Sequence, residues 1–323
     1  YTFTVTDNRT LVANFTQMET VATPTFTPAA GTYVDGTDVT IECTTPGASI
    51  YYTTDGTEPT VNSTLYTAPI ALDATTTIKA MAAKTNMLNS EVATATYRVV
   101  PTWNVTVADV DGGSATANPT ADTTGAVIML TATPDNGYHF GSWTVISGNG
   151  AQVNVAGDQF VMPASDVTVT PTFVPDQYTI TYNTNGGTIN SGNVTTYTYG
   201  VGATLPTDVT KTGYTFNGWY GNANLTGDAV AEVADTEMGN KEFWAKWSVN
   251  AYTVTATASP AAGGAVTGAG TYNYNTSATV SATAADGYLF SNWTENENVV
   301  STDASYTFTV TDNRTLVANF TQM

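Results

Sequence analysis

The sequence repeats itself from end to end. Its first 18 residues, YTFTVTDNRTLVANFTQM, return letter for letter at residues 306–323, an offset of 305. Chance does not produce such an identity, and internal repeats have to be recognised before any local pattern is interpreted. We therefore expect a duplication inside a longer gene, with one 305-residue period plus an overlap in this chain. Residue 1 is then expected to be a cut through a longer polymer.

A second, shorter motif recurs inside that period. The pattern GYxFxxW occurs at residues 137–143, 213–219 and 287–293. Each copy follows an opening strand-like run and a Gly-Gly turn, and each is followed by a strand-like run that ends in an aromatic residue. This predicts three modules of similar plan, at 101–175, 178–248 and 250–322. Residues 1–18 are then the closing strands of a truncated module of the same kind.

The recurring aromatic residues are candidates for the module cores. A module of this size has a small interior, and aromatic side chains bury the most area per residue. The alternative is a row of exposed aromatic rings that stack on sugars. The predicted structural core consists of Phe140, Trp143, Phe216, Trp219, Phe290, Trp293, Phe173, Trp247 and Phe320.

Residues 20–99 follow a different plan. Short alternating runs such as VTIEC and SIYYT are separated by turn sequences, among them the tight-turn pair Asp55-Gly56. About seven short strands with turns every 8–12 residues favour a β-sandwich. The whole chain is thus predicted to be all-β, a linear tandem array with one β-sandwich and three other small β modules per period.

Composition narrows the range of partners. The formal net charge is −19, from 27 acidic and 8 basic residues, which disfavours binding to nucleic acid or to anionic membranes. Thr supplies 67 of the 323 residues, and this β-branched residue suits half-solvated sheet surfaces. No apolar run reaches the length of a membrane helix, so we expect no membrane insertion in this segment.

Catalytic patterns are weak. The single Cys43 leaves no intrachain disulfide, and the single His139 lies within a GYxFxxW copy without a nucleophile elbow. Acidic residues such as Asp55, Asp135 and Asp286 precede Gly or Asn-Gly and are typical of turns. We expect no catalytic residues, no cofactor and no enzyme activity.

One segment has a faint resemblance to a calcium loop. Asp109 and Asp111 alternate before Gly112, as at the start of such a loop. A full loop needs more oxygen ligands and a bidentate carboxylate at its twelfth position, which is missing here. A plain hairpin turn is the main interpretation, and Asp109 and Asp111 remain weak calcium candidates.

Three stretches resemble known families. Residues 178–248, through YTITYNTNGGTI, LPTDVTKTGYTFNGWY and FWAKW, resemble the Listeria–Bacteroides repeat, the B-repeat of internalin-type surface proteins. Residues 101–175 and 250–322 resemble divergent members of that superfamily, through TATPDNGYHFGSW and SATAADGYLFSNW, but lack the closing AKW. The resemblance implies β-grasp-like spacers in bacterial surface proteins.

Residues 20–99 resemble the chitobiase/hexosaminidase C-terminal-type module, through GTYVDGTDVTI, SIYYTTDGTEPT and TIKAMA. That resemblance implies an immunoglobulin-like sandwich that accompanies other domains and carries no catalytic residues of its own.

Together these features predict a structural, extracellular, cell-surface role, as a stalk or a self-assembling fibre. The expected partners are neighbouring copies of the repeat, in the same chain or through strand pairing between chains. The alternatives are a carbohydrate-binding adhesin, which would bind glycans through Tyr51, Tyr52 or Tyr66, and an accessory region of a secreted glycoside hydrolase. We also expect residues 1–18 to form few hydrogen bonds with residues 101–323.

Overall fold

The computed structural model describes all 323 residues, and nearly all of its regular structure is β-strand. The one helical element is a short 3-10 turn, η1 (Ala261–Gly263), and no helix has the length and apolarity needed to cross a bilayer. The predicted fold class, all-β with small tandem modules, is confirmed. The chain forms two compact units, Tyr1–Pro134 with Phe140–Phe173, and Asp135–His139 with Val174–Met323.

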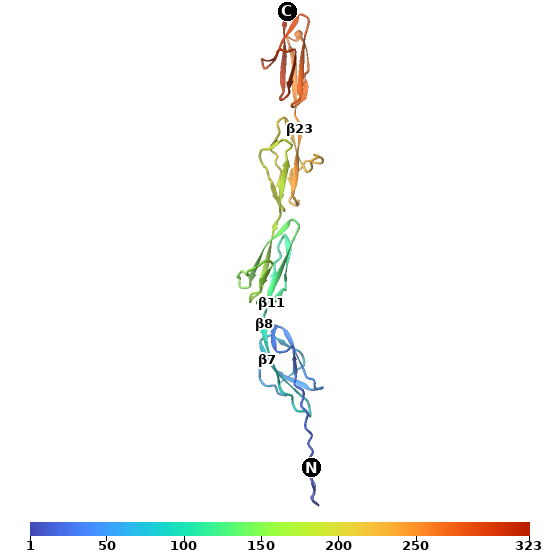
Figure 1. The fold of residues 1–323 in the computed structure, drawn as a ribbon, viewed down its shortest axis with the longest axis vertical. Coiled ribbons are helices and arrows are strands. Elements are labelled where there is room, and N and C mark those ends of the chain that lie inside the picture. Colours follow the sequence, from blue (N-terminus) through green and yellow to red (C-terminus); the bar gives the residue numbers. More distant parts are fainter. The chain divides into compact units, whose positions relative to one another are not determined.

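The first unit begins with a segment that has no strand. Residues 1–18 pair with no other strand, and no hydrogen bond joins them to residues 101–323, as expected. Most of their apolar side chains are exposed, Phe15 to 94%. Figure 1 shows this segment in dark blue, ahead of the first sheet.

A β-sandwich follows, made of one three-stranded and one five-stranded sheet with the orders β1-β3-β6 and β2-β8-β7-β4-β5. Alternate residues of β3, Val39 and Ile41, are buried, and they pack with Leu72, Ile78 and Tyr97 between the sheets. The strands are β1 (Thr25–Thr27), β2 (Gly31–Val34), β3 (Thr37–Glu42), β4 (Ser49–Thr53), β5 (Thr64–Leu65), β6 (Ile70–Leu72), β7 (Thr76–Ala83) and β8 (Ala93–Val100).

The second module of the first unit has the sheets β10-β12-β14 and β11-β9-β15-β13. Its core includes the buried Ile128, Val145 and Phe160. The strands are β9 (Thr102–Val107), β10 (Gly113–Asn118), β11 (Ala121–Thr123), β12 (Val127–Pro134), β13 (Tyr138–Ser147), β14 (Gln159–Val161) and β15 (Val167–Pro175).

The second unit holds two further modules. The first has the sheet β18-β16-β23-β21 and two short ladders, and the second has the sheets β26-β24-β31-β28-β29 and β25-β27-β30. The strands of the first are β16 (Gln177–Asn183), β17 (Thr188–Ile189), β18 (Thr196–Thr198), β19 (Ala203–Thr204), β20 (Val209–Thr210), β21 (Tyr214–Tyr220), β22 (Glu232–Val233) and β23 (Lys241–Val249). Those of the second are β24 (Ala251–Ser259), β25 (Gly264–Thr267), β26 (Gly270–Asn273), β27 (Ser277–Ala284), β28 (Tyr288–Glu295), β29 (Asn298–Ser301), β30 (Ser305–Thr309) and β31 (Arg314–Gln322).

These last three modules share one plan. In each, the first strand pairs in parallel with the last strand, as β9 with β15, β16 with β23, and β24 with β31. The strand that carries GYxFxxW flanks the last strand on its other side, as β13, β21 and β28. The closing strand is therefore central to each sheet, and the module is incomplete without it.

A β-bulge explains the spacing of the motif. In a regular strand, residues three apart point to opposite faces. In β21, however, Phe216 faces Trp247 and Trp219 faces Ala245, so three residues of β21 span two of β23. In β28, Phe290 and Trp293 face Phe320 and Ala318 with the same extra residue. The bulge brings both aromatic residues of the motif onto the core face.

The predicted core aromatics form a cluster in each module. Trp219, Trp293, Phe173 and Phe320 are buried, while Phe140, Trp143, Phe216, Phe290 and Trp247 are half-buried. The motif Phe lies beside both the motif Trp and the closing aromatic, with ring centroids between 4.8 and 6.3 Å apart.

The Gly-Gly turns are explained by the same clusters. The closing aromatic ring packs directly on the second Gly of each pair. A Cβ atom at Gly113, Gly187 or Gly264 would lie within 2.3–2.7 Å of the ring of Phe173, Trp247 or Phe320. A side chain at this position would displace the ring.

Candidate functional site

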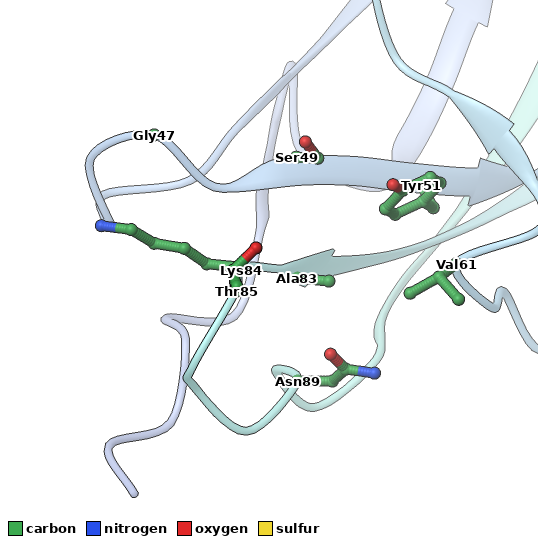
Figure 2. Close-up of a pocket in the computed structure, with 8 residues that line it drawn as sticks. All are labelled: Gly47, Ser49, Tyr51, Val61, Ala83, Lys84, Thr85 and Asn89. Carbon is green, nitrogen blue, oxygen red and sulfur yellow. The ribbon is translucent and has the colours of Figure 1, made fainter.

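An open hollow of about 510 Å³ lies on the five-stranded sheet of the sandwich. It forms where β4 and β7 pair, with Ser49 opposite Ala83 and Tyr51 opposite Met81. Ser49 and Tyr51 are two residues apart, so their side chains share one face. Figure 2 shows the residues that line it. They are Gly47, Ser49, Tyr51, Val61, Ala83, Lys84, Thr85 and Asn89.

The hollow presents polar groups around one aromatic ring. Lys84 Nζ donates a hydrogen bond to the Pro46 carbonyl oxygen at 2.7 Å, and its side chain extends toward the turn at Gly47 (Figure 2). Lys84 is the only lining residue whose side chain makes a hydrogen bond within the chain. The hydroxyl of Tyr51 and the amide of Asn89 are therefore free to bind a ligand. An aromatic ring with nearby free polar groups suits a flat, hydroxyl-rich molecule.

The structure separates the three tyrosines that were candidates for glycan binding. Tyr51 lines the hollow. Tyr52 and Tyr66 pack against the sandwich core and lie edge to face, with ring centroids 6.3 Å apart. Of the three, Tyr51 is the one available to stack on a ligand.

The weak calcium candidates belong to no cluster of metal-binding side chains. Asp109 and Asp111 are exposed in the connection between β9 and β10. No group of three or more His, Cys, Asp or Glu side chains that could hold a metal ion occurs in the structure.

Two linker residues in the second unit form a repeated junction. The Asp176 backbone N–H donates to the Gly137 carbonyl oxygen at 2.8 Å, and its own carbonyl oxygen accepts from the Tyr199 N–H at 2.9 Å. In the next junction, Asn250 bonds to Gly213 and Tyr274 in the same way, at 2.9 and 2.8 Å. Each linker residue thus joins a GYxFxxW turn to the module that follows.

Side chains reinforce both junctions. The ring of Tyr199 lies against Gly137 and that of Tyr274 against Gly213, so closely that a Cβ atom on either Gly would be 2.0–2.6 Å from the ring. The third position of the motif contacts the linker residue itself. His139 Nδ1 lies 2.7 Å from Asp176 Oδ1, and Thr215 Oγ1 donates to Asn250 Oδ1 at 2.7 Å.

The first junction also includes Tyr178. Its hydroxyl donates to Asp176 Oδ2 at 3.2 Å. Burial, and secondly this hydrogen bond to Asp176, raise the pKa of Tyr178 above the ordinary value for a tyrosine.

The third copy of the motif differs at these positions. Leu289 occupies the third position and is 59% exposed, and Met323 takes the place of the linker residue, with its N–H donating to Gly287 O at 2.8 Å. The sequence pattern places residues 176 and 250 at module boundaries and indicates no contact for either. The available signal is the variable third position of the motif, which is polar in the two copies that precede these residues.

Family models match most of the chain. The chitobiase/beta-hexosaminidase C-terminal domain matches residues 28–94, and the Listeria-Bacteroides repeat domain matches residues 178–246. The divergent InlB B-repeat domain matches residues 103–177 and 252–323.

Individual relatives share shorter stretches. Internalin H of Listeria monocytogenes is 33% identical over 151 residues, which are 45% of this chain and 25% of that protein. A protein of Evansella cellulosilytica described as a Gly-rich membrane protein is 29% identical over 119 residues, 37% of this chain and 13% of that protein. The chain therefore spans a quarter or less of these curated relatives.

Among solved structures, the Bacillus anthracis TIE protein aligns with 92% of this chain and 73% of its own, at 10% identity and a TM-score of 0.29. The three resemblances in the sequence are confirmed by the family models: the chain combines a chitobiase-type C-terminal module with one Listeria–Bacteroides repeat and two divergent B-repeats.

Proposed function

We propose that this chain is a non-catalytic spacer of an extracellular bacterial surface protein, which holds other parts of that protein at a distance. The junctions at Asp176 and Asn250 carry this proposal. A flexible linker leaves its backbone solvated, whereas both backbone groups of these two residues are bonded to modules on either side. Bonded linkers limit the bending between modules, which a spacer requires.

The families support the same role. The repeat models match residues 103–177, 178–246 and 252–323, and Internalin H contains related sequence. The net charge of −19 favours solubility and repulsion between neighbouring spacers.

The test measures the distance between two modules of the second unit in the full chain. Spin labels on Val201→Cys and Val299→Cys, both exposed positions, are introduced with Cys43→Ser. The native junction should give a narrow distance distribution by double electron–electron resonance. Inserting Gly-Ser-Gly-Ser after Asn250 should widen it about twofold, because the inserted residues are flexible.

A matched insertion after Gly227 controls for the added residues. Gly227 has a positive φ of 84°, as is typical of a turn, and open space around it. The control should leave the distribution narrow. A native distribution as broad as that of the linker insertion would contradict the spacer proposal.

The hollow at Tyr51 supports a second candidate function, the binding of an uncharged glycan. Stacking on the Tyr51 ring, with hydrogen bonds from Ser49 and Asn89, would supply both apolar and polar contacts. On a glycan array, the full chain should bind a subset of uncharged glycans. Tyr51→Ala should lose at least about tenfold in affinity, since a central aromatic contact dominates such sites.

Val127→Ala, an exposed position in another module, is the control and should bind as the native chain does. Absence of binding across the array, or unchanged binding by Tyr51→Ala, would reject this second function.

A further inference from the structure

The Trp of the GYxFxxW motif has different surroundings in the module of residues 101–175. In the other two modules, Trp219 and Trp293 are 2% and 0% exposed, and their indole N–H groups donate to main-chain carbonyl oxygens. Trp143 is only half-buried, and its Nε1–H donates to Oδ1 of the exposed Asp158 at 2.9 Å. The same motif position is therefore closed in two modules and open in one.

In the two closed modules, a neighbouring segment pairs with the motif Trp itself. Trp219 pairs with Val230, and Trp293 pairs with Ser301. The last strand of the module lies on the other side of each motif strand. With a neighbour on both sides, the Trp lies inside the sheet and its ring is covered.

The equivalent segment of the open module separates from β13 before it reaches the Trp. Residues 152–155 run antiparallel to β13, with Gln152 opposite Ile146. If this ladder continued regularly, it would place Val155 opposite Trp143. Val155 pairs instead with a residue of β14. The separation of the two segments opens a cleft beside the Trp143 ring.

The cleft has an apolar wall and a polar rim. Its volume is about 420 Å³, and it is lined by Trp143, Gln152, Val153, Asn154 and Val155. The two Val residues and the Trp pack against the core of the module. Gln152 and Asn154 alternate with the Val residues and are exposed, so their side chains lie toward solvent.

The polar groups of the cleft are available to a ligand. Among the lining side chains, the indole of Trp143 is the one that makes a hydrogen bond within the chain. That bond holds the ring in place and uses only one oxygen of Asp158. The amides of Gln152 and Asn154 each offer two N–H donors and one acceptor oxygen.

This set of groups suits a saccharide. A pyranose ring has an apolar C–H face, which matches the flat indole ring, and hydroxyl groups around its edge. Hydroxyl groups donate and accept hydrogen bonds, as the two side-chain amides do. The net charge of −19 disfavours an acidic sugar.

We propose that the Trp143 cleft binds an uncharged saccharide, with one sugar ring on the indole and its hydroxyl groups bonded to Gln152 and Asn154. The site belongs to a different module from the Tyr51 hollow and does not depend on the spacer role. Among the modules with the GYxFxxW motif, it occurs where the motif Trp is open to solvent.

The test uses the full chain with Tyr51→Ala, so that the hollow of the sandwich does not contribute. This variant is applied to an array of uncharged glycans that includes cellohexaose, xylohexaose, mannohexaose and chitohexaose. It should bind a subset of them. Adding Gln152→Ala and Asn154→Ala should lower the affinity for the strongest binder at least about tenfold by calorimetry, because two hydrogen bonds are lost.

Gln159→Ala with Asn224→Ala is the matched control, because it removes the same two amide types at exposed positions outside the cleft. The control should keep the affinity of the Tyr51→Ala chain. Gln152 and Asn154 are exposed, so thermal unfolding should show that all variants are folded alike.

Fluorine NMR of the chain labelled with 5-fluorotryptophan locates the bound saccharide. The resonance of Trp143, assigned with Trp143→Phe, should shift on binding, while those of Trp219 and Trp293 should not. No binding by the Tyr51→Ala chain, an equal loss in the control variant, or an unshifted Trp143 resonance would overturn the proposal. Binding that Tyr51→Ala alone abolishes would assign the glycan to the Tyr51 hollow and reject the Trp143 site.

Discussion

The same 18-residue sequence occurs in two settings, at residues 1–18 and at residues 306–323. In the first it forms no strand, and in the second it forms β30 and β31, the latter at the centre of its sheet. Local preference is identical in the two copies, so it cannot account for the difference. The strands form because residues 250–305 supply pairing partners and an apolar face, in keeping with the strong context dependence of β structure.

Hydrogen exchange should show the largest difference. Peptides from the two copies have the same mass, so a mass spectrum sums them. At short labelling times we expect two isotope envelopes of equal area, because amides in β31 are paired and those of residues 1–18 are not. The slow envelope should exchange at least about 10³-fold more slowly. A single envelope would show that the copies share one environment.

Truncating the same aromatic residue in each copy should give the next largest difference. Phe320→Ala should destabilise its module by about 3–5 kcal/mol, because the ring packs on Phe290 and is 6% exposed. Phe15→Ala should change stability by less than about 0.5 kcal/mol. Urea unfolding followed by the fluorescence of Trp293 measures both. Equal losses of stability in the two variants would contradict the different packing of Phe320 and Phe15.

The close contact between Gly264 and Phe320 shows how residues 250–305 can stabilise the second copy. A Cβ atom on Gly264 would lie 2.5 Å from the Phe320 ring and 2.3 Å from Thr283 O. Gly264→Ala should therefore lower the free energy of unfolding of this module by about 1–3 kcal/mol. Gly270→Ala is the control, since its nearest atom is 3.6 Å away. Combining Gly264→Ala with Phe320→Ala should give less than the sum of the two losses, as contacting residues couple.

The two equivalent arginines, Arg9 and Arg314, should show the smallest difference in their contribution to stability. Arg314→Met removes a two-pronged ion pair with Glu295, in which the side chains are 17% and 21% exposed, and should cost about 1–2 kcal/mol. Arg9→Met removes only the contact with Phe3 and should be neutral. Unfolding curves at low and high salt measure the stability of both variants. A loss of stability for Arg9→Met as large as that for Arg314→Met would contradict this prediction.

Much of the fold could be predicted from the sequence, because its strongest signals are repeats. The sequence could not show which face of its strand each GYxFxxW side chain occupies. The bulge between Phe216 and Trp219 changes which residues share a face. A spacing of three is ambiguous until the partner strand is known.

The candidate sites were harder to predict. Sequence could name Tyr51, Tyr52 and Tyr66, but only the pairing of β4 with β7 shows which ring lines a hollow. The junctions were missed because Asp176 and its partner His139 are 37 residues apart and belong to different modules. No local pattern connects such residues.

The pairing of motif and linker has a consequence for how such chains can be rearranged. His139 meets an acidic linker residue and Thr215 meets an amide, so each turn fits the linker that follows it. Recombination between residues 139 and 176, or between 215 and 250, would separate these partners, whereas recombination ahead of the GYxFxxW turn keeps each pair on one fragment. The segment that can be inherited intact therefore runs from the middle of one module to the middle of the next.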